Sequence, residues 1–588
     1  MLLHDSHDPF YRVPGGPAPT GATITIRFRC DEAASVVLRT WMHEELAYPM
    51  AFDGHDLYEA VVTLPKEAGL FWYDFVIYRE DGRTLRYGNA KDKLGGIGAL
   101  YGDEELHSYQ ITIYKPSYKT PAFMHSANIY QIFPDRFWRA PTQSVDDRTD
   151  RHIHASWDED LLTDSDPRSG DHMALDFFGG TLTGIQEKLP YLHDLGITVL
   201  YLNPIFRARS NHRYDTGDYM EIDPLLGTRE EFRSLCQAAE ALGMRVMLDG
   251  VFSHTGEDSR YFNHFGHYDT KGAFQGPESP YYDWYTFQRF PDQYSCWWGI
   301  PSLPECRKNN PEYQKFMFRD RTGVVPYWIH QGSGGWRLDV ADELSMDFLR
   351  KLRTAVKKAD KDAVVLGEVW EDASNKVAYN EVRCYCTGDT LDSVMNYPLR
   401  LAILDFATGA APAGALARLV KHQAEVYPPQ FRYALMNLIG SHDRARALNV
   451  LAGREGVGLS KDEQQALRLT AEEYALAVSR YKTCIDILCA LPGCPTIYYG
   501  DEAGLTGCPD PFCRRPFPWG REDKELQAYV ARKLTERQHS PLLRYGLCDI
   551  DAPDADTLVI TRFMDQVDGL GRKACRKERQ TITIRRGR

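Results

Sequence analysis

The chain has 588 residues, of which 43% are hydrophobic and 26% charged, a balance typical of a soluble globular protein with several domains. Its formal net charge of −13 argues against nucleic acid or an anionic membrane as the main partner, because both attract positively charged surfaces. The sequence has neither an apolar run of 18 residues nor a secretory leader pattern, so we expect a cytoplasmic protein without a membrane segment.

Short β-rich runs alternate with turn signals over residues 21–113, as in TITIRFRC (23–30) and FWYDFVIYRE (71–80). This pattern predicts an all-β sandwich, which we assign to residues 1–120. A proline-flanked connector, YKPSYKTPAF at 114–123, joins it to the next part of the chain.

After this connector, apolar β-rich runs alternate with helical patterns. The runs lie at 128–137, 197–206, 245–254, 335–343, 363–370, 393–399, 433–443 and 495–502. Eight alternating strand and helix units predict a (β/α)8 TIM barrel, which we assign to residues 121–520. The largest insertion, 255–326, follows the third strand and is rich in Tyr, Trp, Pro and Gly, so we expect an inserted domain over the barrel mouth.

One helical pattern, at 469–491, carries a clear start signal, because Thr470 and Glu473 have the spacing of a capping box. Cys484 and Cys489 fall inside this helix, and the thirteen cysteines of the chain lack a CxxC framework. We therefore expect reduced thiols that pack in the core, and neither disulfides nor zinc ligands.

A helical pattern at 524–538 leads into the β-rich run 548–564. We assign residues 521–588 to this helix and a short, truncated C-terminal β domain. The basic run at 572–588 predicts a solvated tail.

Polar residues stand where several predicted barrel strands end. In GGWRLDVADE (334–343), apolar residues up to Val340 alternate with Arg337, Asp339 and then Glu343, which predicts a strand with one charged face. Comparable residues at the other strand ends are Asp249, His254, Glu368, His442 and Asp443. Each alone could cap a helix or satisfy a backbone carbonyl, but catalytic groups of TIM barrels come from these strand ends. Their joint appearance predicts an active site at the barrel mouth.

The motifs DGVFSH, GWRLDVADE, GEVW and GSHD, on predicted strands three, four, five and seven, resemble those of the α-amylase superfamily, glycoside hydrolase family 13. GCPTIYYGDE on the eighth strand adds to the resemblance. Within the superfamily, YQIFPDRF, SPYYDWYTF and CWWG are similar to the group of neopullulanases, cyclomaltodextrinases and maltogenic amylases. The resemblance implies an N-terminal domain similar to a carbohydrate-binding module, and a homodimer formed through it.

The resemblance also implies a role for each matching residue. Asp339 matches the nucleophile, Glu368 the general acid and base, and Asp443 the third carboxylate, which binds sugar hydroxyls. Arg337 then keeps Asp339 ionised, while Glu368 starts protonated. The substrate-binding set that the family implies is Tyr214, His254, Arg337, His442, Asp510 and Arg514, and Asp249 is expected to support Arg337.

Some positions depart from the family pattern. Ser253 replaces a calcium-binding asparagine, Thr181 replaces an aspartate, and FWRAPTQS (137–144) lacks an Asn/Asp-rich calcium loop. Calcium needs six to eight oxygen ligands, so we expect no metal site and no required cofactor; calcium stays an open alternative, although its usual ligands are lost. Asp342 replaces an asparagine on the acceptor side, which leaves the bond specificity open.

The resemblance implies a retaining hydrolase of α-1,4-glucosidic bonds, with α-1,6 bonds as an open alternative, in starch, maltooligosaccharides, pullulan or cyclodextrins. A glucanotransferase or isomerase of the same superfamily remains an alternative, as does a non-catalytic carbohydrate-binding barrel. Three carboxylates that converge and repel one another argue against the non-catalytic reading.

Overall fold

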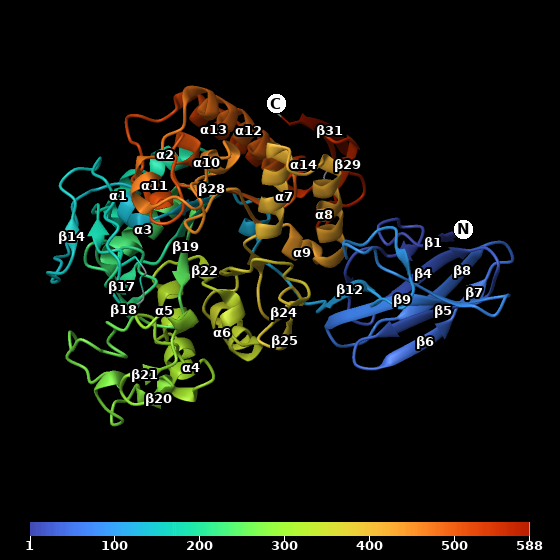
Figure 1. Ribbon diagram of the computed structural model, residues 1–588, viewed down its shortest axis with the longest axis horizontal. Helices are drawn as coiled ribbons and strands as arrows, with labels where there is room; N and C mark the ends of the chain where they lie inside the picture. Colours follow the sequence, from blue (N-terminus) through green and yellow to red (C-terminus); the bar gives the residue numbers. More distant parts are fainter. Residues whose placement is uncertain (169, 171, 575, 587–588) are drawn as a thin grey trace.

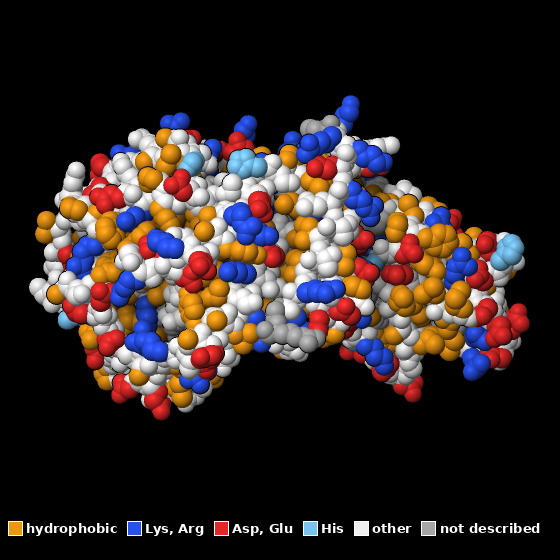
Figure 2. Space-filling view, turned by 90° about the horizontal axis from the view of Figure 1, so that it is seen from above, with side chains coloured by type: hydrophobic (Ala, Val, Ile, Leu, Met, Phe, Trp, Pro, Cys, Tyr) orange, Lys and Arg blue, Asp and Glu red, His pale blue; other side chains and the backbone are white. Residues whose placement is uncertain are grey.

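A computed structural model describes residues 1–588 except 169, 171, 575, 587 and 588 (Figure 1). The N-terminal strands form a β-rich body at one end of the molecule, and the barrel and its helices form the larger body beside it (Figure 1). Figure 2 shows basic and acidic side chains interspersed over the face that it presents. In the part of the chain that the structure describes, none of the helices is both long and apolar enough to cross a membrane.

The N-terminal body is a sandwich of two largely antiparallel sheets, as the sequence predicts. One sheet contains β1 (Leu2–Leu3), β2 (Arg12–Val13), β4 (Thr23–Cys30), β7 (Ala51–Phe52) and β8 (Leu57–Thr63). The other contains β3 (Ala18–Pro19), β5 (Ala33–Trp41), β6 (Glu45–Pro49), β9 (Gly69–Arg79), β10 (Thr84–Gly88), β11 (Ala99–Tyr101) and β12 (Tyr109–Tyr114). Alternate residues of both sheets, such as Ile26, Phe28, Leu38, Phe75 and Ile77, bury their side chains in a core of their own.

The described residues of the larger body form an eight-stranded parallel barrel, which confirms the predicted fold class. The strands are β13 (Ile129–Ile132), β16 (Val199–Leu202), β19 (Arg245–Gly250), β22 (Gly335–Leu338), β23 (Val364–Gly367), β26 (Ser393–Val394), β27 (Met436–Leu438) and β28 (Cys494–Tyr498). Neighbours pair in chain order, β28 also pairs with β13, and a parallel bridge between Met395 and Met436 joins β26 to β27. Each strand coincides with one of the eight predicted runs.

Helices surround the barrel (Figure 1). Their bounds are α1 (Leu182–Glu187), α2 (Leu189–Asp194), α3 (Arg229–Ala241), α4 (Pro311–Phe318), α5 (Val324–His330), α6 (Met346–Ala359), α7 (Tyr397–Thr408), α8 (Ala413–Val426), α9 (Pro429–Arg432), α10 (Ala447–Leu451), α11 (Lys461–Ala466), α12 (Ala471–Ala490), α13 (Lys524–His539) and α14 (Pro541–Tyr545). The predicted capping box of Thr470 and Glu473 starts α12, and Cys484 and Cys489 are buried in it.

Short elements fill the connections. The strands are β14 (His152–Ile153), β15 (Asp176–Phe177), β17 (Phe206–Ala208), β18 (Thr216–Ile222), β20 (Phe287–Arg289), β21 (Gln293–Tyr294), β24 (Lys376–Ala378) and β25 (Glu381–Arg383). The 3-10 turns are η1 (Ala122–Ser126), η2 (Pro134–Arg136), η3 (Ala273–Gln275), η4 (Tyr282–Trp284), η5 (Trp297–Gly299), η6 (Ala341–Glu343), η7 (Asp501–Ala503) and η8 (Phe512–Arg514). The turns η3 to η5 and the pair β20 and β21 lie within the predicted inserted segment 255–326.

The fourth barrel strand ends earlier than its alternating sequence predicts. β22 stops at Leu338, and Val340 adopts a left-handed backbone conformation with φ of 38° before η6 begins. This conformation is costly for a β-branched side chain, and backbone strain of this kind concentrates at functional sites. The predicted alternation therefore fails after Asp339, because the chain turns there and does not continue across the sheet.

The C-terminal residues form an ordered sheet and not the solvated tail that the basic run predicts. Strand β30 (Thr557–Met564) pairs with β29 (Leu547–Asp554) and, over its whole length, with β31 (Glu578–Arg585). Ile582 lies opposite Ile560, so period-two apolar residues outweigh the charge of the run. The buried Arg562 of β30 donates to the carbonyls of Ala490 and Gly546, each at 2.7 Å.

Candidate active site

The C-terminal ends of the barrel strands open into a cavity of about 870 Å³. Eight of the nine predicted site residues line this cavity, and they are Asp339, Glu368, Asp443, Tyr214, His254, His442, Asp510 and Arg514. The ninth, Arg337, lies in β22 just behind the lining and is fully buried. The barrel therefore brings together residues that are up to 300 positions apart in the chain, as the strand-end argument predicts.

Arg337 is the centre of the cluster. Its Nη1 lies 2.9 Å from Asp249 Oδ1 and 3.0 Å from Asp339 Oδ1, while its Nη2 lies 2.7 Å from Glu368 Oε2. The contact with Glu368 is an ion pair outside hydrogen-bond geometry, and it was not predicted. Since neighbouring nitrogens of one guanidinium hold Asp339 and Glu368, these two carboxyls lie close together at the rim.

The charge balance of this cluster differs from the predicted split between Asp339 and Glu368. Burial raises the pKa of Asp339 well above its usual range, although the Arg337 guanidinium opposes the shift. Glu368 instead accepts hydrogen bonds from the Val340 N–H and from Trp370 Nε1, both at 2.9 Å. One buried cation shared among several carboxylates cannot neutralise them all, so the cluster binds a proton more readily than separate carboxylates would.

Asp249 supports Arg337, as predicted, and it also receives two tyrosine hydroxyls. Tyr201 donates to Asp249 Oδ2 at 2.6 Å and Tyr214 at 2.9 Å. Asp249, which lies in the barrel under the cavity, thus holds both tyrosine hydroxyls. Tyr201 and Asp249 are in adjacent strands, β16 and β19, so the barrel register sets this contact.

His442 is held as a neutral imidazole. Gln131 Nε2 donates to its Nδ1 at 2.8 Å, which leaves a proton on Nε2 to face the Tyr214 hydroxyl at 2.6 Å. Burial, with the nearby Arg514 charge, lowers the pKa of His442 well below its usual range. His442 Nε2 also lies 3.2 Å from Asp443, so a hydrogen-bond donor faces this carboxylate at neutral pH.

His254 and Arg514 occupy the walls beside these groups. Ser253 Oγ lies 2.9 Å from His254 Nδ1, and burial lowers the pKa of His254 to about 3. Arg514 donates to the His442 carbonyl at 3.0 Å and pairs with Asp510 at 2.9 Å. These contacts fix side chains that the sequence could assign only by resemblance.

Sequence reasoning missed four residues that shape the site. Trp370 binds Glu368 and stacks on Tyr397 at 3.8 Å between ring centres, and Gln131, Tyr201 and Asn203 orient the groups above them. Trp370 belongs to the quoted GEVW motif and could have been found there. Gln131 and Tyr201 lie in strands and Asn203 directly follows one, and the apolar neighbours of all three conceal them.

The residues near the expected calcium sites have other partners. Arg139 donates to the carbonyls of Phe178 and His154, both at 2.8 Å, and Thr181 Oγ1 accepts from the Gly184 N–H at the start of α1. A guanidinium thus occupies carbonyl oxygens that a cation would need. The residues present therefore do not fit calcium at this position.

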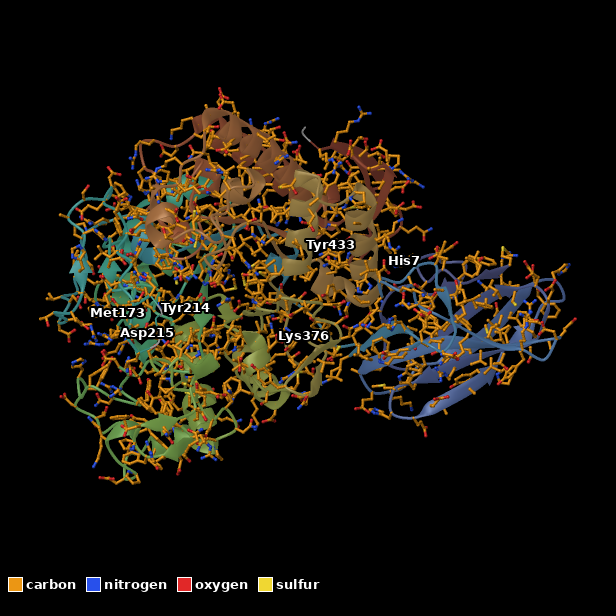
Figure 3. All side chains as sticks on the ribbon, in the orientation of Figure 1. His7, Met173, Tyr214, Asp215, Lys376 and Tyr433 are labelled. Carbon is orange, nitrogen blue, oxygen red and sulfur yellow. The ribbon has the colours of Figure 1, made fainter. Side chains whose placement is uncertain are left out.

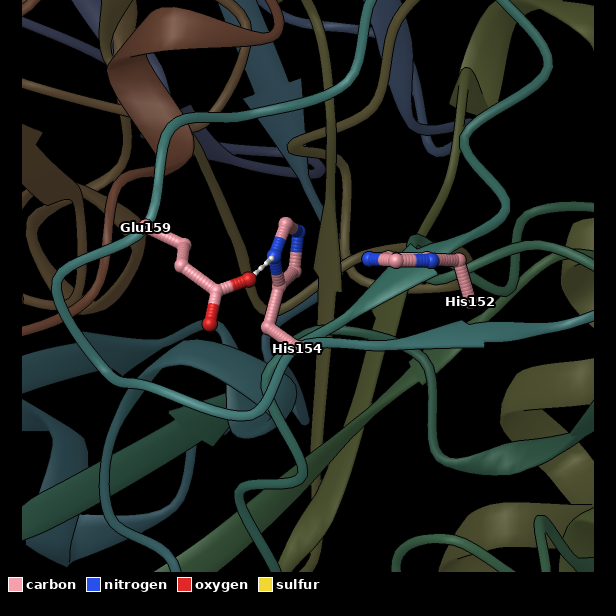
Figure 4. A group of neighbouring side chains, drawn as sticks. All are labelled: His152, His154 and Glu159. Atoms are coloured by element: carbon pink, nitrogen blue, oxygen red, sulfur yellow. Dashed lines mark hydrogen bonds and ion pairs between the residues drawn. The ribbon is translucent and has the colours of Figure 1, made fainter.

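A second group of possible metal ligands is explained by hydrogen bonding. His152, His154 and Glu159 lie close together (Figure 4). His154 Nδ1 contacts Glu159 at 2.9 Å, and its Nε2 contacts Asp176 at 3.2 Å. Both ring nitrogens of His154 thus have carboxylate partners, and the cluster joins the 152–159 loop to β15.

This architecture, a parallel barrel with an insertion after its third strand and clustered carboxylates at its rim, is that of an α-amylase-type glycoside hydrolase. The family model described as "Alpha amylase, catalytic domain" matches residues 131–542. The chain therefore belongs to the α-amylase family, which confirms the resemblance inferred from its motifs.

The chain is 34% identical to a cyclomaltodextrinase of Geobacillus thermopakistaniensis, over 86% of this chain and 80% of that protein. It is 36% identical to an amylopullulanase of Thermoanaerobacter thermohydrosulfuricus over 93% of this chain, but it spans only 39% of that longer protein. Among solved structures, a cyclomaltodextrinase matches with a TM-score of 0.66 and 27% identity, over 96% of this chain and 90% of that one. The ligand-free cyclic α-maltosyl-(1→6)-maltose hydrolase of Arthrobacter globiformis matches at 0.65 and 33%, over 80% and 93%.

The pKa of Asp443 gives a test of the cluster. Burial, and secondly the charge of Glu368, raise this pKa to about 7 in the folded protein, against about 3.9 for an unfolded aspartate. The resulting stability is complete below about pH 3.9 and is lost as pH rises through about 7. We expect the melting temperature of Asp443→Asn to increase relative to that of the wild type as pH rises from 5 to 8.

The exposed Asp362→Asn serves as the control. Its melting temperature should change with pH in the same way as that of the wild type over this range. A difference between Asp443→Asn and the wild type that stays constant with pH would contradict the raised pKa.

Proposed function

We propose that this chain is a retaining glycoside hydrolase that cleaves α-1,4-glucosidic bonds in starch-type glucans and maltooligosaccharides. The observation that carries the proposal is the contact of Arg337 with both Asp339 and Glu368 at the wall of one cavity. Carboxyls held this close suit a direct attack on the sugar, because retaining glycosidases need a gap of about 5 to 5.5 Å.

In the proposed cycle, Asp339 attacks the anomeric carbon while Glu368 gives its proton to the glycosidic oxygen. The bond to the leaving sugar breaks, and a covalent ester forms on Asp339. Glu368 then takes a proton from water, whose oxygen attacks the same carbon and frees the Asp339 carboxylate. The cycle requires the proton of the cluster to reside on Glu368 once sugar fills the cavity and displaces water.

The remaining residues of the cavity are proposed to bind sugar hydroxyls. Asp443 is a carboxylate that accepts hydrogen bonds, His442 presents its Nε2 proton, and Tyr214 presents a ring at the cavity wall. Arg514 and Asp510 pair at the wall and are proposed to hold the next sugar. Together they bind the substrate on both sides of the reacting carbon.

Transfer to a sugar acceptor is a second candidate activity. Trp298 and Tyr379 line the cavity and are 73% and 64% exposed, so flat aromatic surfaces are available to an incoming sugar. Cleavage of α-1,6 bonds is a further candidate, supported by the similarity of this chain to the cyclic α-maltosyl-(1→6)-maltose hydrolase of Arthrobacter globiformis. Product analysis on starch, pullulan and cyclodextrins separates these activities.

We also propose a homodimer through the N-terminal domain and a cytoplasmic location. Exposed apolar side chains on the N-terminal sheets, among them Phe52, Val61 and Tyr78, support a contact surface there. Light scattering after gel filtration measures the mass of the particle and so detects a dimer. A variant that lacks residues 1–120 should be a monomer.

The reacting carboxyls should be essential for turnover and not for folding. We expect Asp339→Asn and Glu368→Gln each to lower kcat by about 10³-fold or more, because each change removes a reacting group and keeps the side-chain shape. Initial rates on maltohexaose and melting curves measure the two effects. The exposed Asp347→Asn on α6 is the control and should keep full activity. Activity losses that follow losses in melting temperature would count against the assignment.

The stereochemistry provides an independent test. Double displacement at Asp339 should release the α-anomer first, and a 2-fluoro glycosyl fluoride should leave a covalent adduct on a peptide that contains Asp339. Proton NMR during the first minutes of hydrolysis detects the anomer, and mass spectrometry locates the adduct. Early appearance of the β-anomer would rule out Asp339 as nucleophile.

We propose that the enzyme requires no metal, since Arg139 and the Thr181 cap use the groups at one expected calcium position and Ser253 replaces the asparagine of the other. Treatment with EDTA should leave both activity and melting temperature within experimental error of the untreated protein. A fall in melting temperature that calcium reverses would reveal a calcium site elsewhere and overturn this proposal.

A further inference from the structure

The hairpin of β24 and β25 forms one end of the cavity. Lys376, Ala378 and Tyr379 line it, and they follow Glu368 closely in the chain. Figure 3 shows Lys376 on one side of Tyr214 and Met173 with Asp215 on the other. If Glu368 protonates the leaving oxygen, as the proposed function holds, the hairpin borders the sugars that leave or accept.

The inner side of the hairpin is tied to the segment that follows Asp339. Lys376 and Tyr385 both bind the carboxylate of Asp342, and Tyr379 binds Glu343. Asp342 itself is nearly buried. The position of the hairpin therefore determines where the side chains of Lys376, Tyr379 and Asp342 lie at this end of the cavity.

The outer side of the hairpin is held by the N-terminal domain. Gln110 of β12 is 4% exposed, and its Nε2 donates to Ser374 Oγ at 3.0 Å while its Oε1 accepts from Asn375 Nδ2 at 2.6 Å. Both ends of one amide thus bind the two residues that directly precede Lys376. In Figure 1, β12 runs from the N-terminal body toward β24 and β25.

The stem on either side of this contact is also fixed. Asp372 accepts from Tyr427 at 3.0 Å and contacts His422 of α8 at 2.8 Å. In the segment that follows β25, the Thr387 carbonyl accepts from the Lys115 N–H at 3.0 Å. With its stem immobilised at these points, the hairpin has little freedom to shift unless one of the contacts is lost.

We propose that Gln110 is a positioning residue, through which the N-terminal domain holds the β24–β25 hairpin against the leaving-group end of the cavity and so sets the binding of acceptor sugars. Gln110 acts through Ser374 and Asn375 and touches no reacting group. Asp339 and Glu368 are held by Arg337 within the barrel, so the chemical step itself does not depend on Gln110.

Loss of the amide removes the partner of the buried Ser374 hydroxyl and of the half-buried Asn375 amide, and the hairpin must move to regain hydrogen bonds. Small displacements of groups that position a substrate lower rates strongly. A substrate with sugars beyond the cleavage point should lose this binding. A glycosyl fluoride should not, because its leaving group is a single fluoride ion.

The test compares kcat/KM for maltohexaose with kcat/KM for α-maltosyl fluoride in the full-length protein. In Gln110→Leu, we expect the ratio of the two values to fall about tenfold, with the value for the fluoride nearly unchanged. Ser374→Ala should show the same selective loss from the barrel side of the contact. The double variant should lose no more than Gln110→Leu alone, since that change already breaks the contact with Ser374.

Two further variants separate positioning from general destabilisation. Gln110→Glu retains an acceptor for Asn375 and for the Ser374 hydroxyl, so it should restore most of the ratio. Arg418→Ala removes an ion pair with Asp92 at 2.5 Å that also joins α8 to the N-terminal domain, and it should leave the ratio unchanged.

A folded Gln110→Leu protein with a wild-type ratio overturns the proposal. If this variant does not fold, Ser374→Ala decides the matter by the same ratio. A wild type inactive on both substrates instead refutes the proposed hydrolase function, so the two failures are distinguishable.

Discussion

The buried guanidinium of Arg337 is the interaction on which the site depends. A single cation contacts Asp249, Asp339 and Glu368, which come from three adjacent barrel strands. A buried charge is tolerated only when it is paired and hydrogen-bonded, so the barrel must deliver all of these partners at once. The tyrosines that donate to Asp249 and the donors around Glu368 complete this requirement. The register of the eight described barrel strands therefore brings these partners together around Arg337. The same contacts that pack the site also balance its charge and position its carboxyls.

The same electrostatics connect Arg337 and its partners to the rest of the cavity. Asp443 lines the same cavity as Glu368 and lies in the field of Glu368, Arg337 and Arg514, so its pKa depends on these neighbouring charges. His442 stays neutral because it is buried beside cations, and it can therefore donate without adding charge. In the proposed function, sugar that replaces water in the cavity acts on carboxyls, Asp339 and Asp443, whose pKa values burial has already raised.

The sequence predicted most of the barrel and most of the site, because both depend on local patterns. Apolar runs marked each barrel strand, and polar residues at strand ends marked the rim. The contact between Arg337 and Glu368 could not be predicted, since it depends on the register of β22 against β23. The turn at Val340 carries no glycine or proline signal. Gln110 and Ser374 lie 264 positions apart, in a strand and a loop with no local signal of contact. The basic run misled because its charge concealed the apolar alternation of Ile582 and Ile584.

The C-terminal sheet has a consequence for the stability of the barrel. Without β31, the full length of β30 would present an unpaired edge. Arg562, in that same strand, donates to the carbonyl at the end of α12, the helix that leads into the eighth barrel strand. A helix of the barrel thus depends on a strand that lies outside the barrel. Loss of β31 would expose an edge open to aggregation and weaken the support of α12 at the same time.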